Sequence, residues 1–192
     1  AHPRPTLEAV MELQAQANDW EGVVNAKRAI LEVAEEQERF GMLDQCGDIY
    51  REKLGNAEKA IAFYVDALSI EPNSHVVLHK LLELYTETKQ WKRAVEIVVR
   101  LTELESDPGL KAKYFYTAAV IYRDEVKALD EAVDFYNQAL DHASDLLKAF
   151  EAIDRICTQK KDWKALERNY RKMIKRLPQE GSSELKVMLW HN

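Results

Sequence analysis

The chain has 192 residues, of which 46% are hydrophobic, enough to build one or two folded domains. It contains only 6 glycines and 5 prolines, too few for a disordered, collagen-like or turn-rich all-β protein. A net charge of −6 argues against a general nucleic-acid binder, and no apolar run approaches the roughly 18 residues that a membrane helix needs. The 2 cysteines cannot build a disulfide framework, which favours a reducing, cytoplasmic compartment.

Apolar residues recur at helical spacing along the chain, and turn-forming residues such as Gly55-Asn56 separate the periodic stretches. After residue 77 the apolar side chains fall at i, i+3, i+4 and i+7: Leu78, Leu81, Leu82 and Tyr85. No segment of four or more residues alternates cleanly between apolar and polar, as a strand would. The pattern predicts an all-α chain of helices of about 12–18 residues joined by short turns.

The sequence also repeats itself at a constant offset, which superimposes Gly47 on Ala119. The segment from Gly47, GDIYREKLGNAEKAIAFYVDAL, aligns without a gap with the segment from Ala119, AVIYRDEVKALDEAVDFYNQAL. A second sequence type surrounds Trp20, Trp91 and Trp163, which recur at nearly the same offset. The two types alternate, so one unit has about 36 residues, the size of a helix–turn–helix repeat.

Small and large side chains are distributed in these segments as closely packed helix pairs require. Two antiparallel helices approach closely only where one of them offers a small side chain, and large rings then fill the space beside it. The small residues are Gly47, Ala60, Ala67, Ala119, Ala132 and Ala139, and the rings are Tyr50, Tyr64, Tyr122 and Tyr136. A pair this short cannot bury its apolar face alone, so the pairs must stack into a solenoid with a concave and a convex side.

The segment GDIYREKLGNAEKAIAFYVDALSIEPN has a glycine and a tyrosine on its first expected helix, alanine, tyrosine and alanine on its second, and then a proline. These residues are Gly47, Tyr50, Ala60, Tyr64, Ala67 and Pro72. At this spacing the segment resembles the tetratricopeptide repeat, with one extra residue in the Leu54–Ala57 turn. The resemblance implies an all-α, right-handed α-α superhelical solenoid of helix–turn–helix repeats.

The resemblance extends over nearly the whole chain, which we expect to form a single solenoid, residues 1–192. The expected units are approximately 4–37, 40–72, 75–108, 112–141 and 147–178. Leu185, Met188 and Leu189 then mark a first helix, 182–192, that has no second helix. Since the chain also begins without methionine, we interpret it as a fragment of a longer repeat protein. In this fragment, the truncated C-terminal helix would offer a surface for self-association.

Candidate catalytic and metal-binding residues are few. His75, His79 and Glu83 lie on one stripe of an expected helix, but His75 and Glu83 are about 12 Å apart along its axis, too far to share one ion. Cys46 and Cys157 stand where the family has packing residues, so we expect buried, inert thiols. No glycine-rich phosphate loop and no Ser-His-Asp arrangement is readable. We therefore predict no metal, no cofactor and no enzymatic activity.

Tetratricopeptide-like proteins usually hold an extended peptide or a partner helix in a groove lined by their first helices. The resemblance places the groove at Glu8, Glu12, Asp44, Asp48, His79, Glu83, Tyr116, Val120, Glu151 and Arg155. Chaperone-binding members use lysine and asparagine at such positions to clamp a terminal carboxylate, whereas the first three pairs here are mostly acidic. We therefore expect no chaperone-type clamp, and a groove that prefers a basic or neutral segment.

The predicted function is a non-enzymatic scaffold for protein–protein interaction. Two alternatives stay open: a regulatory or interaction arm of a larger multidomain protein, and an RNA-contacting helical repeat. The second alternative requires basic residues repeated on the concave face, but the one basic run, within 160–176, lies mostly on an expected second helix that faces outward. We accordingly expect a protein or peptide partner, and neither nucleic acid nor a membrane.

Overall fold

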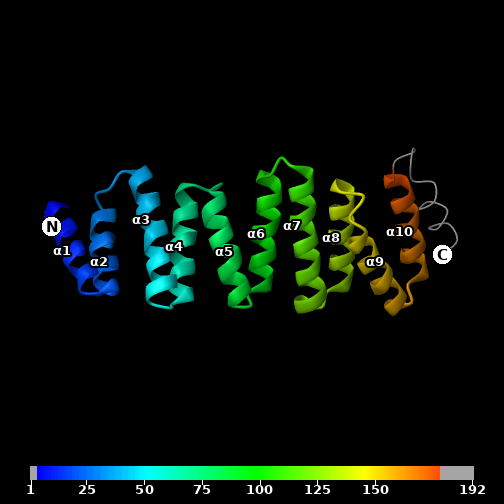
Figure 1. Ribbon diagram of the computed structural model, residues 1–192, viewed down its shortest axis with the longest axis horizontal. Helices are drawn as coiled ribbons and strands as arrows, with labels where there is room; N and C mark the ends of the chain where they lie inside the picture. The colour runs from blue at the N-terminus through cyan, green and yellow to red at the C-terminus, as the bar shows by residue number, and fades with distance from the viewer. Residues whose placement is uncertain (1–3, 178–192) are drawn as a thin grey trace. The chain divides into compact units, whose positions relative to one another are not determined.

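The computed structural model describes residues 4–177 (Figure 1). The chain divides into two compact units, Ala1–Gln90 and Trp91–Asn192. Every regular element within 4–177 is a helix, so the predicted all-α helical-repeat class is confirmed. The expected helix at 182–192 lies outside the described residues.

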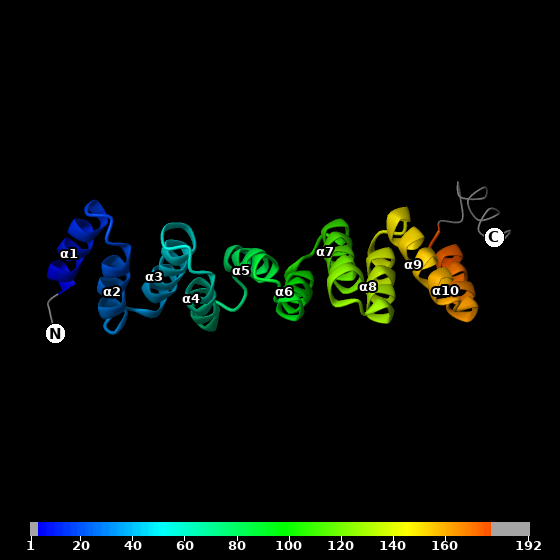
Figure 2. The same cartoon turned by 90° about the horizontal axis from the view of Figure 1, so that it is seen from below.

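The first unit contains consecutive helices joined by short turns. They are α1 (Arg4–Gln16), α2 (Trp20–Leu31), α3 (Glu36–Asp48), the π-helical turn η1 (Ile49–Lys53), α4 (Ala57–Ile70) and α5 (His75–Glu87). Helix α1 packs on α2 and α3 packs on α4, and both views show these neighbours side by side (Figures 1 and 2). The first and second helices of each pair are therefore defined by contact as well as by sequence.

The second unit has the same construction. Its elements are α6 (Trp91–Leu104), α7 (Pro108–Ile121), the π-helical turn η2 (Tyr122–Val126), α8 (Leu129–His142), α9 (Leu147–Lys160) and α10 (Trp163–Arg176). Helix α7 packs on α8 and α9 packs on α10. The core between them is built from alanines and larger apolar side chains, including Ala119, Ala132, Tyr136, Leu140, Ile153 and Met173, each fully buried.

The turns from a first to a second helix share one backbone conformation. One residue in each turn adopts a left-handed conformation with φ between 55° and 61°: Asn18, Gly55, Lys89, Lys127 and Lys161. In three turns the next residue caps the second helix, because the side chains of Asp19, Asn56 and Asp162 accept backbone N–H bonds of 3.0 Å from the first turn. The left-handed residue ends one helix and the capping residue starts the next.

The tryptophans of the second sequence type, Trp20, Trp91 and Trp163, are the first residues of α2, α6 and α10. Each of them therefore stands at the start of a second helix. Trp20 and Trp91 are half-buried, whereas Trp163 is 59% exposed.

The extra residue in the Leu54–Ala57 region is accommodated by a wider helical turn. At the end of α3 the backbone changes to π geometry, in which the Leu54 N–H donates to the Ile49 carbonyl at 3.1 Å. The same π turn follows α7 at Tyr122–Val126, the equivalent place in the second copy of this repeat.

Helices α3 and α4 approach closely where Gly47 faces the ring of Tyr64. A Cβ atom on Gly47 would lie 2.4 Å from Cε1 of Tyr64, well inside van der Waals contact. The ring cannot retreat freely, because the Tyr64 hydroxyl donates to Oδ1 of Asp48 at 2.6 Å. Glycine is therefore required at this position by packing.

We predict that Gly47→Ala lowers the free energy of unfolding by about 1–3 kcal/mol, because the added methyl forces α3 and α4 apart. Gly41→Ala is the matched control on the same helix, since a Cβ atom there would meet nothing within 4 Å. It should raise the free energy of unfolding by about 0.5–1 kcal/mol through helix propensity. Urea unfolding followed by circular dichroism measures both, and equal effects would contradict the packing argument.

Candidate binding surface on the first helices

Asp44 and Asp48 of α3 do not stand as free carboxylates, because Lys80 of α5 lies between them. The Lys80 ammonium donates to Oδ1 of Asp44 at 2.7 Å and to Oδ2 of Asp48 at 2.9 Å. It also lies 5.3 Å from the centre of the Tyr64 ring. Burial lowers the pKa of Lys80, but the hydrogen bonds to the two carboxylates outweigh it and hold this pKa above its ordinary value. One lysine therefore compensates part of the predicted acidic surface.

Glu83 of α5 has a cationic partner as well. The guanidinium of Arg51, in η1, lies 2.8 Å from Glu83 and 3.2 Å from Glu87. Both carboxylates are largely exposed, so each ion pair is screened by solvent and adds little stability. Glu83 still presents its carboxylate to solvent.

The remaining predicted residues of the first unit are Glu8, Glu12 and His79. Glu8 accepts from Arg4 Nε at 2.9 Å, and Arg4 also pairs with Glu38 of α3. Glu12 and His79 are exposed. The structure thus links Asp44 with Asp48 through Lys80, and it leaves the side chains of Glu12, His79 and Glu83 exposed on their helices.

In the second unit, three of the four predicted residues meet around a cavity of about 260 Å³. Tyr116 of α7 and Glu151 and Arg155 of α9 line it, and Val120 does not. The other lining residues are Arg123, Lys148 and Ala152. Three cations and one carboxylate therefore surround this space, the reverse of the charge on the first helices of the first unit.

The two units treat one repeated tyrosine differently. Tyr64 and Tyr136 occupy equivalent positions of the repeat and are both fully buried. Position 120, which corresponds to Asp48, is a valine, so the Tyr136 hydroxyl lacks that carboxylate acceptor and makes no hydrogen bond of ordinary geometry within the described residues. The Tyr136 ring instead packs edge-on against Tyr116, with centres 5.4 Å apart, and lies under the Arg123 guanidinium. A buried phenol without a partner is costly, and here it lies behind residues that line the cavity.

Lys80, Arg51 and Arg123 were not predicted from the sequence, although one signal could have found the first two. Several opposite charges that pair in the structure are separated by about one repeat length, because equivalent positions of successive repeats become neighbours. These pairs are Asp44 and Lys80 (36 residues), Arg51 and Glu87 (36), Asp141 and Arg176 (35), and Arg4 and Glu38 (34). A search for opposite charges at this spacing would have identified both.

Other candidate chemistry is limited in residues 4–177. Cys46 and Cys157 are buried as predicted, and burial raises the pKa of both thiols, that of Cys46 to about 11. No group of three or more His, Cys, Asp or Glu side chains in these residues is arranged to hold a metal ion. Within the same range, no helix is both long and apolar enough to cross a bilayer.

Several residues of the basic run within 160–176 form ion pairs with acidic residues of the chain. Lys160 pairs with Asp130, Arg171 with Glu167, and Arg176 with Asp141. Arg176 keeps only 11% of its side chain exposed. The run is therefore less available to an external anion than its charge suggests.

Pairs of antiparallel helices that stack through small residues and rings define a helical-repeat protein. Residues 42–74, which span most of α3 together with η1 and α4, match the family model of the tetratricopeptide repeat, the family that this segment resembles by sequence. A search of curated protein sequences finds no match.

Among solved structures, the chain is similar to MamA AMB-1, with 17% identity, a TM-score of 0.52 and coverage of 96% of each chain. It is also similar to a crystal structure of MamA protein, with 15% identity, a TM-score of 0.50 and coverage of 94% of each chain. At this identity the likeness establishes the fold alone.

The two tyrosines give a paired prediction on stability. Tyr64→Phe removes a hydrogen bond to a carboxylate and should lower the free energy of unfolding by about 1.5–3 kcal/mol. Tyr136→Phe removes a buried hydroxyl without a partner in the described residues and should leave the free energy of unfolding unchanged or raise it by up to about 1 kcal/mol. Chemical unfolding of both variants decides the point, and a large loss in Tyr136→Phe would show that its hydroxyl has a partner.

Stability should also fall at alkaline pH. Burial raises the pKa of Tyr136 to about 12, and burial together with a hydrogen bond to Asp154 raises the pKa of Tyr170 to about 12. The unfolded chain ionises these tyrosines near pH 10, so their contribution is complete below about pH 10 and is lost between about pH 10 and 12. Urea unfolding across this range should show a shallower decline in Tyr136→Phe/Tyr170→Phe than in the unaltered chain. Equal slopes would contradict the assignment.

Proposed function

We propose that the chain is a non-catalytic scaffold that holds an extended peptide or a partner helix along its first helices. Tetratricopeptide repeats are generally interaction modules, which supports a protein partner. The observation that carries the proposal is the open acidic surface of α1 and α5, where Glu12 and Glu83 stay exposed.

The charge of this surface sets the proposed partner. In the first unit, Lys80 and Arg51 offset part of the acidic charge, but carboxylates remain in excess at the predicted groove positions. A basic or neutral segment is attracted there, and a terminal carboxylate is repelled. The second unit differs because its cavity is lined by Arg123, Lys148 and Arg155. The proposed preference for a basic segment therefore concerns the first unit.

Three amidated, fluorescently labelled peptides of equal length test the proposal: repeats of Lys-Gly-Leu, of Ser-Gly-Leu and of Glu-Gly-Leu. The basic peptide should bind the protein about ten-fold more tightly than the acidic one in fluorescence anisotropy, and salt should reduce the difference. Glu12→Lys/Glu83→Lys should abolish the preference. Glu58→Lys, a charge reversal at an exposed position of the second helix α4, should not. Tightest binding of the acidic peptide would overturn the proposal.

Substitution of Lys80 should increase the affinity for the basic peptide. Lys80→Met frees Asp44 and Asp48 while keeping most of the aliphatic stem, so affinity for the Lys-Gly-Leu peptide should rise about three- to ten-fold. Lys59→Met is the control, because it also removes the lysine that pairs with a carboxylate, that of Glu21, but on the second helices. An unchanged affinity in a Lys80→Met protein of normal helicity would contradict the proposed site.

A further inference from the structure

One aromatic pair occurs twice in the chain, at equivalent positions of the repeat. Tyr50 stacks on Phe63 with ring centres 5.5 Å apart and an interplanar angle of 19°. Tyr122 stacks on Phe135 with ring centres 5.3 Å apart and an angle of 14°. Each tyrosine belongs to a π turn and each phenylalanine to the following second helix. The two pairs therefore allow a direct comparison of their surroundings.

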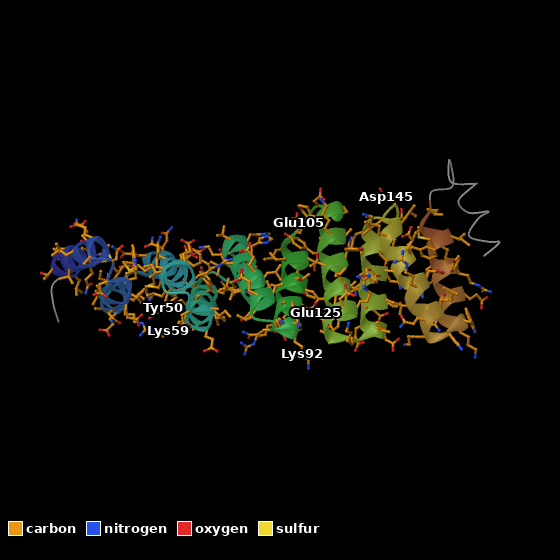
Figure 3. All side chains as sticks on the ribbon, turned by 60° about the horizontal axis from the view of Figure 1, so that its bottom comes forward. Tyr50, Lys59, Lys92, Glu105, Glu125 and Asp145 are labelled. Atoms are coloured by element: carbon orange, nitrogen blue, oxygen red, sulfur yellow. The ribbon has the colours of Figure 1, made fainter. Side chains whose placement is uncertain are left out.

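In the first unit, charged side chains cover the ring pair. The guanidinium of Arg28, in α2, lies 5.1 Å from the centre of the Phe63 ring. Lys59 lies 4.8 Å from the centre of the Tyr50 ring (Figure 3). Lys59 also pairs with Glu21 at 3.1 Å. The Tyr50 hydroxyl donates to the same glutamate at 2.9 Å, and Tyr50 is only 2% exposed.

In the second unit, the covering residues are exchanged. The offset that superimposes Trp20 on Trp91 places Val99 at the position of Arg28, and a valine has no guanidinium to lay over the Phe135 ring. Lys92 and Glu131 replace Glu21 and Lys59 with their charges reversed, and no ion pair joins them in the part of the chain that the structure describes. Figure 3 labels Lys92 at the start of α6. Tyr122 and Phe135 are consequently only half-buried.

This exchange leaves a hollow of about 790 Å³ between α6, η2 and α8. Its apolar lining consists of Val95, Val99, Tyr122, Val126, Ala128 and Phe135. Its charged lining consists of Lys92, Glu96, Arg100, Glu103 and Glu131. Glu96, Glu103 and Glu131 are exposed and take part in no ion pair within residues 4–177. The hollow thus combines an aromatic floor with carboxylates in excess over cations.

We propose that this hollow binds an arginine side chain of a partner protein, presented on an extended segment with apolar neighbours. In the first unit, the guanidinium of Arg28 lies over the equivalent ring pair. In the second unit, the position equivalent to Arg28 is Val99, so the chain itself supplies no guanidinium from there. Arginine suits the site better than lysine, because a planar guanidinium stacks on an aromatic face while it donates to carboxylates. The lining of α6 from Lys92 to Glu103 is about 16 Å long, enough for four or five extended residues.

The site differs from the proposed groove, whose positions in this unit lie on α7 and α9. Binding at the hollow can therefore be measured separately from binding along the first helices, and failure of one proposal leaves the other intact.

The direct test uses labelled Gly-Leu-Arg-Leu-Gly, acetylated and amidated so that it carries no terminal charge. Its fluorescence anisotropy should report binding that weakens about five-fold or more when arginine is replaced by lysine, and further when it is replaced by leucine or glutamate. Equal binding of the leucine peptide would mean that the hollow is a plain apolar groove. That result, tighter binding of the glutamate peptide, or no binding of the arginine peptide would overturn the proposal.

A substitution within the chain locates the site. Val99→Arg supplies the residue that covers the ring pair in the first unit, so it should weaken binding of the arginine peptide about ten-fold or more. Val65→Arg, on the exposed part of α4, is the matched control and should leave binding unchanged. Glu103→Gln/Glu131→Gln is an independent variant that removes two carboxylate charges without adding volume to the hollow. It should weaken binding of the arginine peptide without weakening binding of the leucine peptide. Unchanged arginine binding in both Val99→Arg and Glu103→Gln/Glu131→Gln would overturn the proposal.

Discussion

The contact between Gly47 and the ring of Tyr64 is the constraint on which the first unit depends. It sets the distance between α3 and α4, and the Tyr64 hydroxyl extends the same contact to Asp48 at the surface. Asp48 is shared with Lys80 of α5, so the ring in the core and the charges outside it form one connected network. Packing within a helix pair and pairing with the next helix therefore cannot be changed independently.

The second unit shows what happens when this network is removed. Ala119 takes the place of the glycine, and Val120 takes the place of the aspartate. The Tyr136 hydroxyl has no aspartate at position 120 to donate to, and Ala119 and Tyr136 both lie fully buried in one core. A buried phenol without a carboxylate acceptor lies there, beside a cavity lined by three cations and one carboxylate. Two copies of one helix pair thus support different surfaces on the same backbone.

The sequence was sufficient to predict the helices, their pairing and the burial of Tyr50, Tyr64 and Tyr136, because those features follow from periodicity and side-chain volume. Tyr122, expected to be packed in the same way, is only half-buried. The sequence revealed an extra residue near Leu54 but not the π turn that accommodates it. The choice between α and π hydrogen bonding depends on contacts along the whole turn, which the sequence alone does not give. The partners of Asp44 and Glu83 were missed because they come from the next repeat or from the helix end. The difference between Val99 and Arg28 was missed because the repeat is recognised by residues that are identical in its copies, and these two equivalent residues are not identical.

The covered and uncovered ring pairs bear on how repeat chains diversify. The same stacked rings are covered by a guanidinium in one repeat and left half-exposed where the equivalent position is a valine in another. One side chain therefore decides whether an aromatic surface belongs to the interior of its unit or to its exterior. Repeats that share one backbone can in this way differ in the surface they present without any change in their helices.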